Sequence, residues 1–313
     1  MKPVIAVSLG DPAGVGPEVV LKAVNSREIE DCCEIVVYGS GAVLAATCST
    51  LSLTMPRRII DDGQLSKVVP TGEINSEAGS AAIRWVREAA AAVMEGTADA
   101  LVTAPINKEA AALGGSTFPG HTELLADLAG CRDVSMMLVS GNLRVIHVST
   151  HVSLRSALDA ISVSSVSKTI ESAIKGCSLL EIDSPLVAVA GVNPHAGEGG
   201  KFGLEECNIL APAIAACRMR GWRVVGPEAP DIVFARAVKG EFDIVVAMYH
   251  DQGHIPVKLS GFDRGVNVTV GLPFIRTSPD HGTAFDIAGR GVARPHSMIA
   301  AILLAVEMVK RRG

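Results

Sequence analysis

Short apolar runs alternate with longer segments of helical periodicity along the whole chain, and this alternation limits the folds that it can form. The expected strands are Val4–Ser8, Glu34–Tyr38, Ala98–Thr103, Leu186–Ala190 and Ile244–Met248, and the clearest expected helices are Glu77–Glu95 and His296–Arg311. Such alternation predicts an α/β fold in which helices cover both faces of a mostly parallel sheet. Because 48% of the residues are apolar but only 4% are aromatic, we expect an aliphatic core.

One segment departs from this pattern. In Met136–Val148, two apolar runs flank the turn sequence Ser140-Gly141-Asn142, which predicts a β-hairpin and therefore some antiparallel strands. The 313 residues suffice for one large α/β unit or for two intimate domains. No flexible linker separates two parts of the chain, so two domains would be interwoven.

The composition argues against several kinds of partner. The formal net charge is −5 and the basic residues are scattered, so a nucleic-acid groove is not expected. The sequence shows no leader peptide and no apolar stretch of membrane-spanning length, which favours a cytoplasmic protein without a membrane partner. Seven cysteines without CxxC spacing predict reduced, mostly buried thiols.

Polar clusters follow several of the expected strands. They are Gly10–Pro12, Pro105–Lys108, Asn193–His195 and Tyr249–Gln252. Ligands of open α/β sheets bind beyond the carboxyl ends of the strands. We therefore expect the four clusters to contribute to one site.

Histidines are the first indication of chemistry at these strand ends. Three of them lie in polar, glycine-rich surroundings, namely His151, His195 and His250. Neutral imidazoles from separate strand ends can bind Zn²⁺, Co²⁺ or Mn²⁺. A lone histidine at a strand end is more often a hydrogen-bonded structural residue, and it is the three together that make a metal site an equal alternative. Asp231 or Asp251 could orient one imidazole. His147 lies inside the apolar hairpin and is expected in the core.

Anion binding is the second indication. Lys258, Asn267 and Arg276 recur at nine-residue spacing among apolar or glycine neighbours, where a solvated charge is not expected. A buried cation requires a carboxylate of the protein or an anionic ligand, so internal salt bridges are the alternative to a ligand site. A phosphorylated acid would suit Arg276, which can grip it through two hydrogen bonds. His121 is expected at a helix start, as a donor to such a ligand or as a plain cap.

The glycine-rich segment Leu9–Glu18 follows the first strand and opens a helix. It is not the dinucleotide fingerprint, because Gly10, Gly14 and Gly16 have the wrong spacing, and it lacks the Lys-Ser/Thr of a P-loop. A nicotinamide cofactor would therefore bind outside the usual Rossmann mode.

Taken together, these motifs resemble the 4-hydroxythreonine-4-phosphate dehydrogenase family of vitamin B6 biosynthesis and its paralogues. The resemblance covers essentially the whole chain and rests on Gly10–Glu18, Gly120–Glu123, Asn193–Gly199, Tyr249–Gly253 and Gly265–Thr283. It implies two α/β/α domains of the isocitrate/isopropylmalate dehydrogenase type, one formed by 1–125 with 271–313 and the other by 126–270. It also implies a homodimer with shared active sites in the cleft between the domains.

The resemblance assigns roles to individual residues. One divalent ion (Zn, Mg, Mn or Co) would be bound by His151, His195 and His250, with one ligand donated by the partner subunit. The substrate would contact His121, Thr122, Lys258, Asn267 and Arg276. The cofactor, NAD with NADP as the alternative, would lie near Gly271, Leu272, Pro273, Thr277, Asp280 and Thr283.

The reaction that the resemblance implies is the oxidation and decarboxylation of a 4-phosphorylated hydroxy acid. Hydride would leave for NAD⁺ while the metal stabilises the charge on oxygen, and the β-keto acid would then lose CO₂. Lys258, aided by Asp251 or His254, would handle the proton.

The substrate is either 4-phosphohydroxy-L-threonine, giving 3-amino-2-oxopropyl phosphate, or D-threonate or D-erythronate 4-phosphate, giving dihydroxyacetone phosphate. His254 and Ile255 resemble the second branch. The alternatives are a dehydrogenase of an aromatic cis-dihydrodiol acid, a metal-dependent hydrolase with three histidines, and a non-catalytic sugar-phosphate-binding protein.

Overall fold

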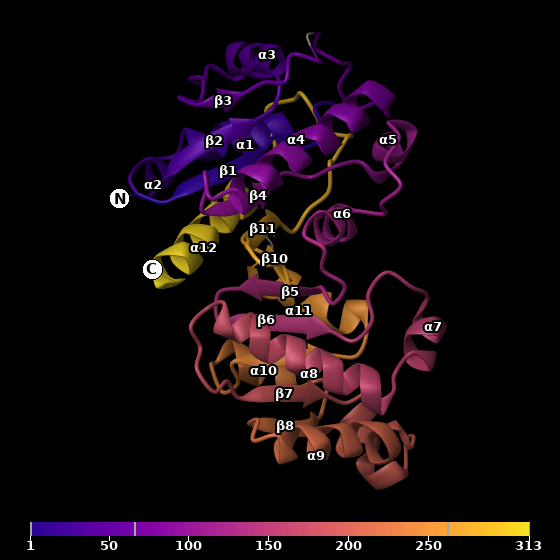
Figure 1. Cartoon of the computed structure of the whole chain (residues 1–313). Helices are drawn as coiled ribbons and strands as arrows, with labels where there is room; N and C mark the ends of the chain where they lie inside the picture. The colour runs from indigo at the N-terminus through magenta and orange to yellow at the C-terminus, as the bar shows by residue number, and fades with distance from the viewer. Residues whose placement is uncertain (1, 66, 262, 313) are drawn as a thin grey trace. The chain divides into compact units, whose positions relative to one another are not determined.

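The computed structural model describes residues 2–65, 67–261 and 263–312, and the chain divides into two compact units (Figure 1). Unit 1 comprises Met1–Val134 and Leu272–Gly313, and unit 2 comprises Ser135–Gly271. The sequence placed the boundaries after residues 125 and 270. Each unit has its own layered α/β architecture, and the expected α/β class is confirmed.

Unit 1 is built on a parallel sheet in the order β3-β2-β1-β4-β11. Its strands are β1 Val4–Ser8, β2 Glu34–Tyr38, β3 Ile59–Ile60, β4 Ala100–Thr103 and β11 Ile275–Pro279. Its helices are α1 Gly16–Val24, α2 Arg27–Glu30, α3 Gly41–Leu51, α4 Ser76–Met94, α5 Lys108–Leu113, α6 His121–Leu128 and α12 His296–Arg312. Helix α4 covers one face of the sheet, and α1 and α12 cover the other (Figure 1).

Local sequence explains the long helix α4 and its close packing. Asn75 caps the helix by accepting a hydrogen bond from the Ala78 backbone N–H at 3.0 Å. Gly79 then lets α5 approach, because a Cβ at that position would lie 2.0 Å from the Ala110 carbonyl oxygen. On the inner face of α4, Trp85 is fully buried.

Unit 2 is built on a mixed sheet in the order β10-β5-β6-β9-β7-β8. Its strands are β5 Ser135–Ser140, β6 Leu143–His147, β7 Val187–Ala190, β8 Val224–Glu228, β9 Ile244–Ala247 and β10 Val266–Val270. Its helices are α7 Leu154–Asp159, α8 Val163–Ser178, α9 Ala211–Met219, α10 Val233–Val238 and α11 His250–Gly261, with the short turns η1 Pro194–Gly200 and η2 Glu206–Leu210. The hairpin expected in Met136–Val148 is confirmed, because β5 and β6 are antiparallel, whereas β6, β9, β7 and β8 are parallel.

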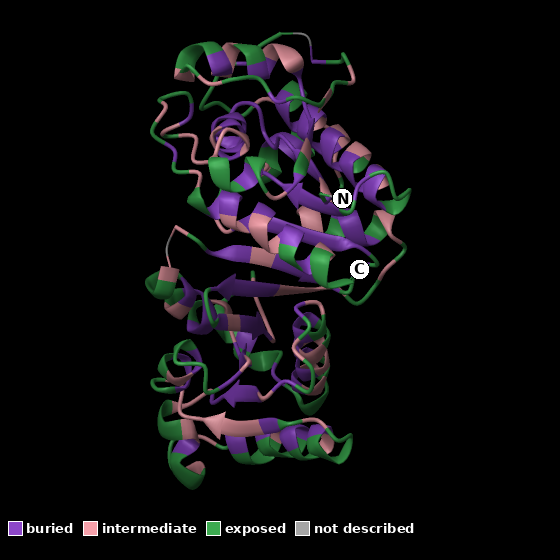
Figure 2. Ribbon diagram, turned by 90° about the vertical axis from the view of Figure 1, so that its left-hand side faces the viewer, coloured by how far each residue is buried: buried purple, intermediate pink, exposed green. Residues whose placement is uncertain are grey.

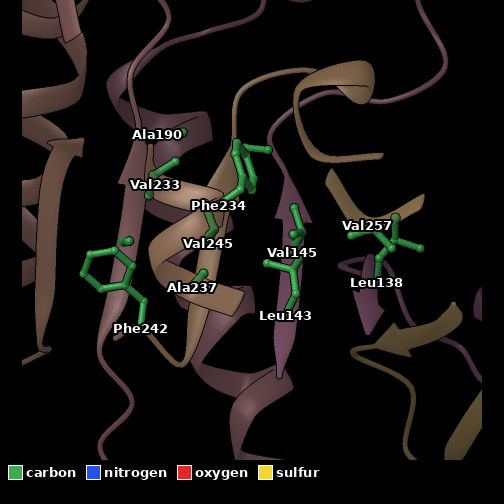
Figure 3. Close-up of a cluster of buried hydrophobic side chains, with 12 residues drawn as sticks. Leu138, Leu143, Val145, Ala190, Val233, Phe234, Ala237, Phe242, Val245 and Val257 are labelled. Carbon is green, nitrogen blue, oxygen red and sulfur yellow. The ribbon is translucent and has the colours of Figure 1, made fainter. Parts of the chain in front are cut away.

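The core of unit 2 lies between this sheet and the helices α10 and α11. Figure 3 shows Val233 and Phe234 of α10 and Val257 of α11 turned toward the aliphatic side chains of β5, β6, β7 and β9. Figure 2 shows the same pattern in the chain as a whole, with buried residues on the strands and on the inner helix faces. None of the described helices combines the length and the apolar character that a membrane crossing requires.

The predicted strand bounds differ from the observed ones where side chains or helix ends capture backbone groups. The strand expected from Leu186 begins at Val187, because the Leu186 backbone N–H donates to Asp243 Oδ2 at 2.7 Å. The strand expected to reach Met248 ends at Ala247, because the Met248 N–H donates to Gln252 Oε1 at 2.6 Å. Such captures depend on residues remote from the apolar run, so periodicity does not reveal them.

Candidate active site

The loop after β1 in unit 1 is held by backbone hydrogen bonds and by the buried carboxylate of Asp11, whose Oδ1 accepts the Ala13 N–H at 2.9 Å. The Asp11 N–H donates to the Pro105 carbonyl and the Val15 N–H to the Thr283 carbonyl, both at 2.9 Å. Gly10 has a φ of +73°, and a Cβ there would lie 2.5 Å from the Pro105 oxygen. The polar clusters Gly10–Pro12 and Pro105–Lys108 therefore meet at the carboxyl ends of β1 and β4, as two of the four clusters were expected to do.

Arg276 lies beside this edge, on β11, and is only 2% exposed. Its Nη2 donates to Thr103 Oγ1, at the end of β4, at 2.6 Å. Burial lowers the pKa of Arg276 to about 10, and the negative charge of Glu123 opposes that shift. Because a guanidinium with this pKa stays protonated at neutral pH, unit 1 holds a buried positive charge at the strand ends.

His121 is the first residue of α6, as the sequence predicted. Burial lowers its pKa well below the ordinary value, and the cations Arg276 and Lys108 lower it further. The imidazole is therefore neutral. In the described part of the chain its buried Nε2 atom has no hydrogen-bond partner. Together, His121 and Arg276 make an environment suited to an anionic ligand.

Four histidines cluster in unit 2. The rings of His250 and His254, one turn apart on α11, are stacked with their centroids 3.6 Å apart. The ring of His151 lies 5.7 Å from that of His250, and the ring of His147 lies 4.7 Å from that of His254. His147 is buried, as expected, and burial followed by the charges of His254 and His250 lowers its pKa to about 3.

A cavity of about 300 Å³ opens beside two of these rings, within unit 2. Among its lining residues are Thr150, His151, Val152, Tyr249, His250 and Asp251. Unit 1 has a larger cavity of about 540 Å³, lined by Lys2, Cys33 and Arg57. It contains none of the predicted site residues and lies at the amino ends of β1 and β2, so we place the chemistry at the smaller cavity.

Two of the predicted metal ligands lie close together. His250 Nδ1 is hydrogen-bonded to Asp251 Oδ1 at 2.7 Å, which leaves Nε2 for a metal, and Asp251 thus orients an imidazole as the sequence suggested. Imidazoles that share a tetrahedral ion with metal–nitrogen distances of about 2.1 Å place their ring centroids roughly 5.3 Å apart, and the 5.7 Å between the rings of His151 and His250 is close to that value.

His195 does not join this pair. Its ring lies 6.3 Å from that of Phe202, and the described residues contain no group of three or more histidine, cysteine or acidic side chains placed to hold a metal. A single chain therefore brings together two of the three predicted ligands.

The loop that carries His195 has an unusual backbone. Residues from His195 to Gly199 all have positive φ angles, between +44° and +76°, and thus form a left-handed turn. For His195, Ala196 and Glu198, which are not glycine, this conformation costs roughly 1–2 kcal/mol each. Strain of this kind persists only where surrounding contacts hold it, and it is concentrated at functional sites.

The remaining predicted substrate and catalytic residues differ in how far they are buried. Lys258 is exposed on α11, so the expectation that it lies where a charge is not solvated is wrong. The physical reason is that Pro256–Lys258 belong to a helix with one face in water rather than to a buried strand. Asn267, on β10, is half-buried, and His254, a predicted catalytic residue, is buried against His250.

The predicted cofactor residues surround β11. Thr277 is fully buried, and its hydroxyl donates to the Ala301 carbonyl of α12 at 2.8 Å. Leu272 is buried, Gly271 has a φ of +101°, and the Thr283 carbonyl holds the loop after β1. Their assignment to the cofactor stays a prediction.

Sequence reasoning missed two buried residues beside the histidine loops. Gln252 donates from Nε2 to the Gly191 carbonyl at 2.7 Å and so ties the end of β7 to the start of α11. Glu206, only 2% exposed, accepts two backbone hydrogen bonds from the loop after β7. Gln252 lies inside a motif already singled out, whereas in the pair Glu205-Glu206 nothing in the spacing tells which carboxylate is buried.

Fold and site together define an α/β enzyme with a buried cationic region in unit 1 and a histidine cluster in unit 2. A profile of the family described as pyridoxal phosphate biosynthetic protein PdxA matches residues 31–305. The chain belongs to this family, and it is a dehydrogenase that depends on NAD(P). The expected family and the expected class of enzyme are therefore confirmed.

Relatives from both branches of the family resemble the chain equally well. D-threonate 4-phosphate dehydrogenase of Pectobacterium atrosepticum is 44% identical over 98% of this chain and 100% of its own length. 4-Hydroxythreonine-4-phosphate dehydrogenase of Geobacter metallireducens is 45% identical over 100% and 97%. The crystal structure of 4-hydroxythreonine-4-phosphate dehydrogenase from Klebsiella pneumoniae superposes with a TM-score of 0.89 at 44% identity, covering 99% of this chain and 98% of that one.

Proposed function

We propose that this protein catalyses the NAD-dependent, divalent-metal-dependent oxidation and decarboxylation of a 4-phosphorylated hydroxy acid. The observation that carries the proposal is Arg276, a guanidinium buried at the end of the unit 1 sheet beside His121. A buried positive charge next to a neutral imidazole favours a ligand with concentrated negative charge, and phosphate offers the geometry that a guanidinium grips best.

Each group of residues has a role in this reaction. Arg276, His121 and Thr122 bind the phosphorylated acid, and Asn267 and Lys258 contribute further contacts. Lys258 lies on the same helix as His250 and is our candidate for taking up the hydroxyl proton. Gly271–Pro273 and Thr277 would hold the cofactor, which we take to be NAD and which would supply the hydride acceptor.

We assign the metal to His151, His195 and His250. Zn, Co, Mn or Mg would stabilise the negative charge that develops on the substrate oxygen during hydride transfer and again during loss of CO₂. The spacing of His151 and His250 and the bond from Asp251 support this assignment. The third ligand would join when two copies of the chain assemble, with one of the histidines donated by the partner subunit.

A homodimer is part of this proposal. On α11, Leu259 is 84% exposed and Ile255 is 55% exposed, and on α7 Leu154 is 58% exposed. Exposed apolar side chains on helices that carry or line a site favour burial against another chain. Light scattering of the purified protein should give twice the mass of the chain, and Leu259→Glu should lower that mass. A monomer in solution would refute the shared-site arrangement.

Within the family we favour D-threonate or D-erythronate 4-phosphate over 4-phosphohydroxy-L-threonine. Overall identity does not separate the branches, since relatives of both names match at 44% and 45%. The residue that supports the choice is His254, whose ring is stacked on that of the metal ligand candidate His250. Its Nδ1 is also hydrogen-bonded to the His250 carbonyl at 3.1 Å.

The decisive assay follows NADH formation on the three phosphorylated acids side by side, with NAD⁺ and with Mg²⁺, Mn²⁺, Co²⁺ or Zn²⁺. Preference for D-threonate or D-erythronate 4-phosphate supports the proposal, whereas preference for 4-phosphohydroxy-L-threonine would place the enzyme in the B6 branch. If the metal-bound enzyme turned over none of the three acids, the proposal that its substrate is phosphorylated would be refuted. Inorganic phosphate serves as the matched competitor and should inhibit wild type but not Arg276→Ala.

A further inference from the structure

The loop after β7 is separated from the backbone ladder of the sheet. The Gly191 N–H still donates to the Glu228 carbonyl of β8, at 2.8 Å. From Val192 onward the chain leaves the sheet and enters the left-handed turn that carries His195. The conformation of this turn therefore depends on contacts other than strand pairing.

Glu206 supplies such contacts from the first residue of η2. Its Oε1 accepts the backbone N–H groups of Val192, at 2.8 Å, and of Asn193, at 2.7 Å. Its Oε2 accepts the side-chain Nδ2 of Asn193 at 2.9 Å. One carboxylate thus satisfies the two amide groups that lie just before the turn, where no strand is available to do so.

The turn itself closes around the same carboxylate. A Cβ added to Gly197, whose φ is +76°, would lie 2.6 Å from Glu206 Oε2. A Cβ added to Gly191 would lie 3.3 Å from Glu206 Oε1 and 2.9 Å from the Ala196 Cα. The side chain of Glu206 therefore fills the inside of the loop, and the two glycines leave the room that it occupies.

We propose that Glu206 is a positioning residue that holds the loop Val192–Gly200 in its left-handed turn and thereby sets the direction of the His195 imidazole. The part that concerns His195 rests on the proposed function, in which His195 is a metal ligand. The part that concerns the loop stands on the contacts of Glu206 alone. Removing the carboxylate leaves two backbone N–H groups without acceptors, and the strained turn then relaxes.

The neighbouring acid provides a matched control. Glu205 is half-buried, and within the described residues the one loop group that donates to it is Asn193 Nδ2, at 2.7 Å, which is a side-chain and not a backbone group. Glu205→Gln should leave the turn intact. Glu206→Gln keeps one carbonyl oxygen for the two backbone N–H groups, so that its effect should lie between that of the control and that of Glu206→Ala.

The first measurement is hydrogen exchange on the metal-free protein, followed by mass spectrometry of a peptide that spans the loop. In Glu206→Ala, the amides of Val192 and Asn193 should exchange at least ~10-fold faster than in wild type, because their acceptor is gone. Peptides from β9, in the core of unit 2, should be unchanged. Loop exchange within twofold of wild type would overturn the proposal.

The second measurement is the affinity for Co²⁺, read from its absorption spectrum. Loss of a residue that orients a ligand typically weakens metal binding by about 10–100-fold, and we expect that loss in Glu206→Ala and less than a twofold change in Glu205→Gln. Faster loop exchange with unchanged Co²⁺ affinity would refute the link to His195. If His195→Ala itself left Co²⁺ affinity unchanged, the metal assignment would fail, while the exchange data would still decide the role of Glu206.

Gly197→Ala tests the same contact from the other side and does not depend on how well Glu206→Ala folds. Its added methyl group should displace the carboxylate and accelerate exchange of the same amides. Because both substitutions break one contact, the combined acceleration in the double variant should be smaller than the product of the two single effects, even though alanine at a φ of +76° adds strain of its own. Fully additive effects would show that the two residues act independently and would contradict the proposal.

Discussion

The loops after β1 in unit 1 and after β7 in unit 2 occupy equivalent places, beyond the carboxyl ends of parallel strands, but differ in how much of their support comes from the backbone. The loop after β1 is fixed by backbone hydrogen bonds from its neighbours together with one from the Ala13 N–H to Asp11 Oδ1, and it places Gly10 where the φ is positive. The loop after β7 has non-glycine residues at positive φ and is fixed by the side chain of Glu206. Both loops thus use a buried carboxylate, but the first places its positive φ on a glycine, whereas the second holds non-glycine residues at positive φ.

The two regions also differ in their electrostatics. The unit 1 region is buried and carries the positive charge of Arg276, whose low exposure makes any ligand contact strong. The histidine cluster of unit 2 mixes the buried rings of His147 and His254 with the exposed His151. A dry cationic region suits tight binding of an anion, and a partly open cluster suits a metal that must still receive substrate.

The largest effect on activity should come from the buried cationic region of unit 1, which contains Arg276 and His121. Arg276→Ala should lower kcat/KM for the phosphorylated substrate by on the order of 10³, because a buried bidentate contact to phosphate is lost. The bidentate contact is the one proposed above; steady-state kinetics provides the measurement, and Arg276→Lys is the matched control because it keeps the charge without the planar fork. Near-normal kcat/KM in Arg276→Ala would show that the buried charge of unit 1 does not bind the phosphorylated substrate.

The next largest effect should be a loss of protein stability caused by a substitution in the loop after β1. Gly10→Ala should lower the free energy of unfolding by about 3 kcal/mol, because its Cβ would lie 2.5 Å from the Pro105 oxygen at a φ of +73°. Urea denaturation measures the difference. Gly63→Ala is the control, since its φ is also positive but its Cβ would meet nothing within 4 Å. Equal losses of stability in both variants would mean that the positive φ alone, and not the contact with Pro105, makes alanine unfavourable at position 10.

A smaller effect is expected at the histidine cluster. Asp251→Asn should weaken Co²⁺ binding by roughly 10-fold, because the amide orients His250 Nδ1 less strongly than the carboxylate does. Calorimetric titration with the metal gives the affinity. Asp231→Asn, which changes the other acid that the sequence suggested, should have no effect. The reverse outcome would assign the orienting role to Asp231.

The smallest effect has the opposite sign. Ala196→Gly should raise the free energy of unfolding by about 0.5 kcal/mol, since relief of the left-handed conformation exceeds the added entropy of the unfolded chain. The same urea experiment compares it with Ala13→Gly in the unit 1 loop, which should be destabilising. A loss of stability in Ala196→Gly would show that the turn after β7 is not strained.

Much of the fold and of the site composition could be read from the sequence, because both depend on local patterns. The strands Val4–Ser8 and Glu34–Tyr38 were predicted with their observed bounds, since buried parallel strands form continuous apolar runs. The hairpin around Gly141 followed from its turn residues, and family membership followed from the motifs that contain His195 and His250. The exposed position of Lys258 was not foreseen, because its apolar neighbours belong to a helix with two unlike faces.

What the sequence by itself determined is therefore the α/β class, the family and the kinds of side chain that the reaction needs. Only the tertiary structure decided which of them meet, since contacts between residues far apart in the chain leave no periodic trace. It paired His151 with His250 and left His195 apart, buried Arg276 beside His121, and chose Glu206 over Glu205 as the acid inside the loop. Packing places those side chains, and packing is a property of the folded chain as a whole.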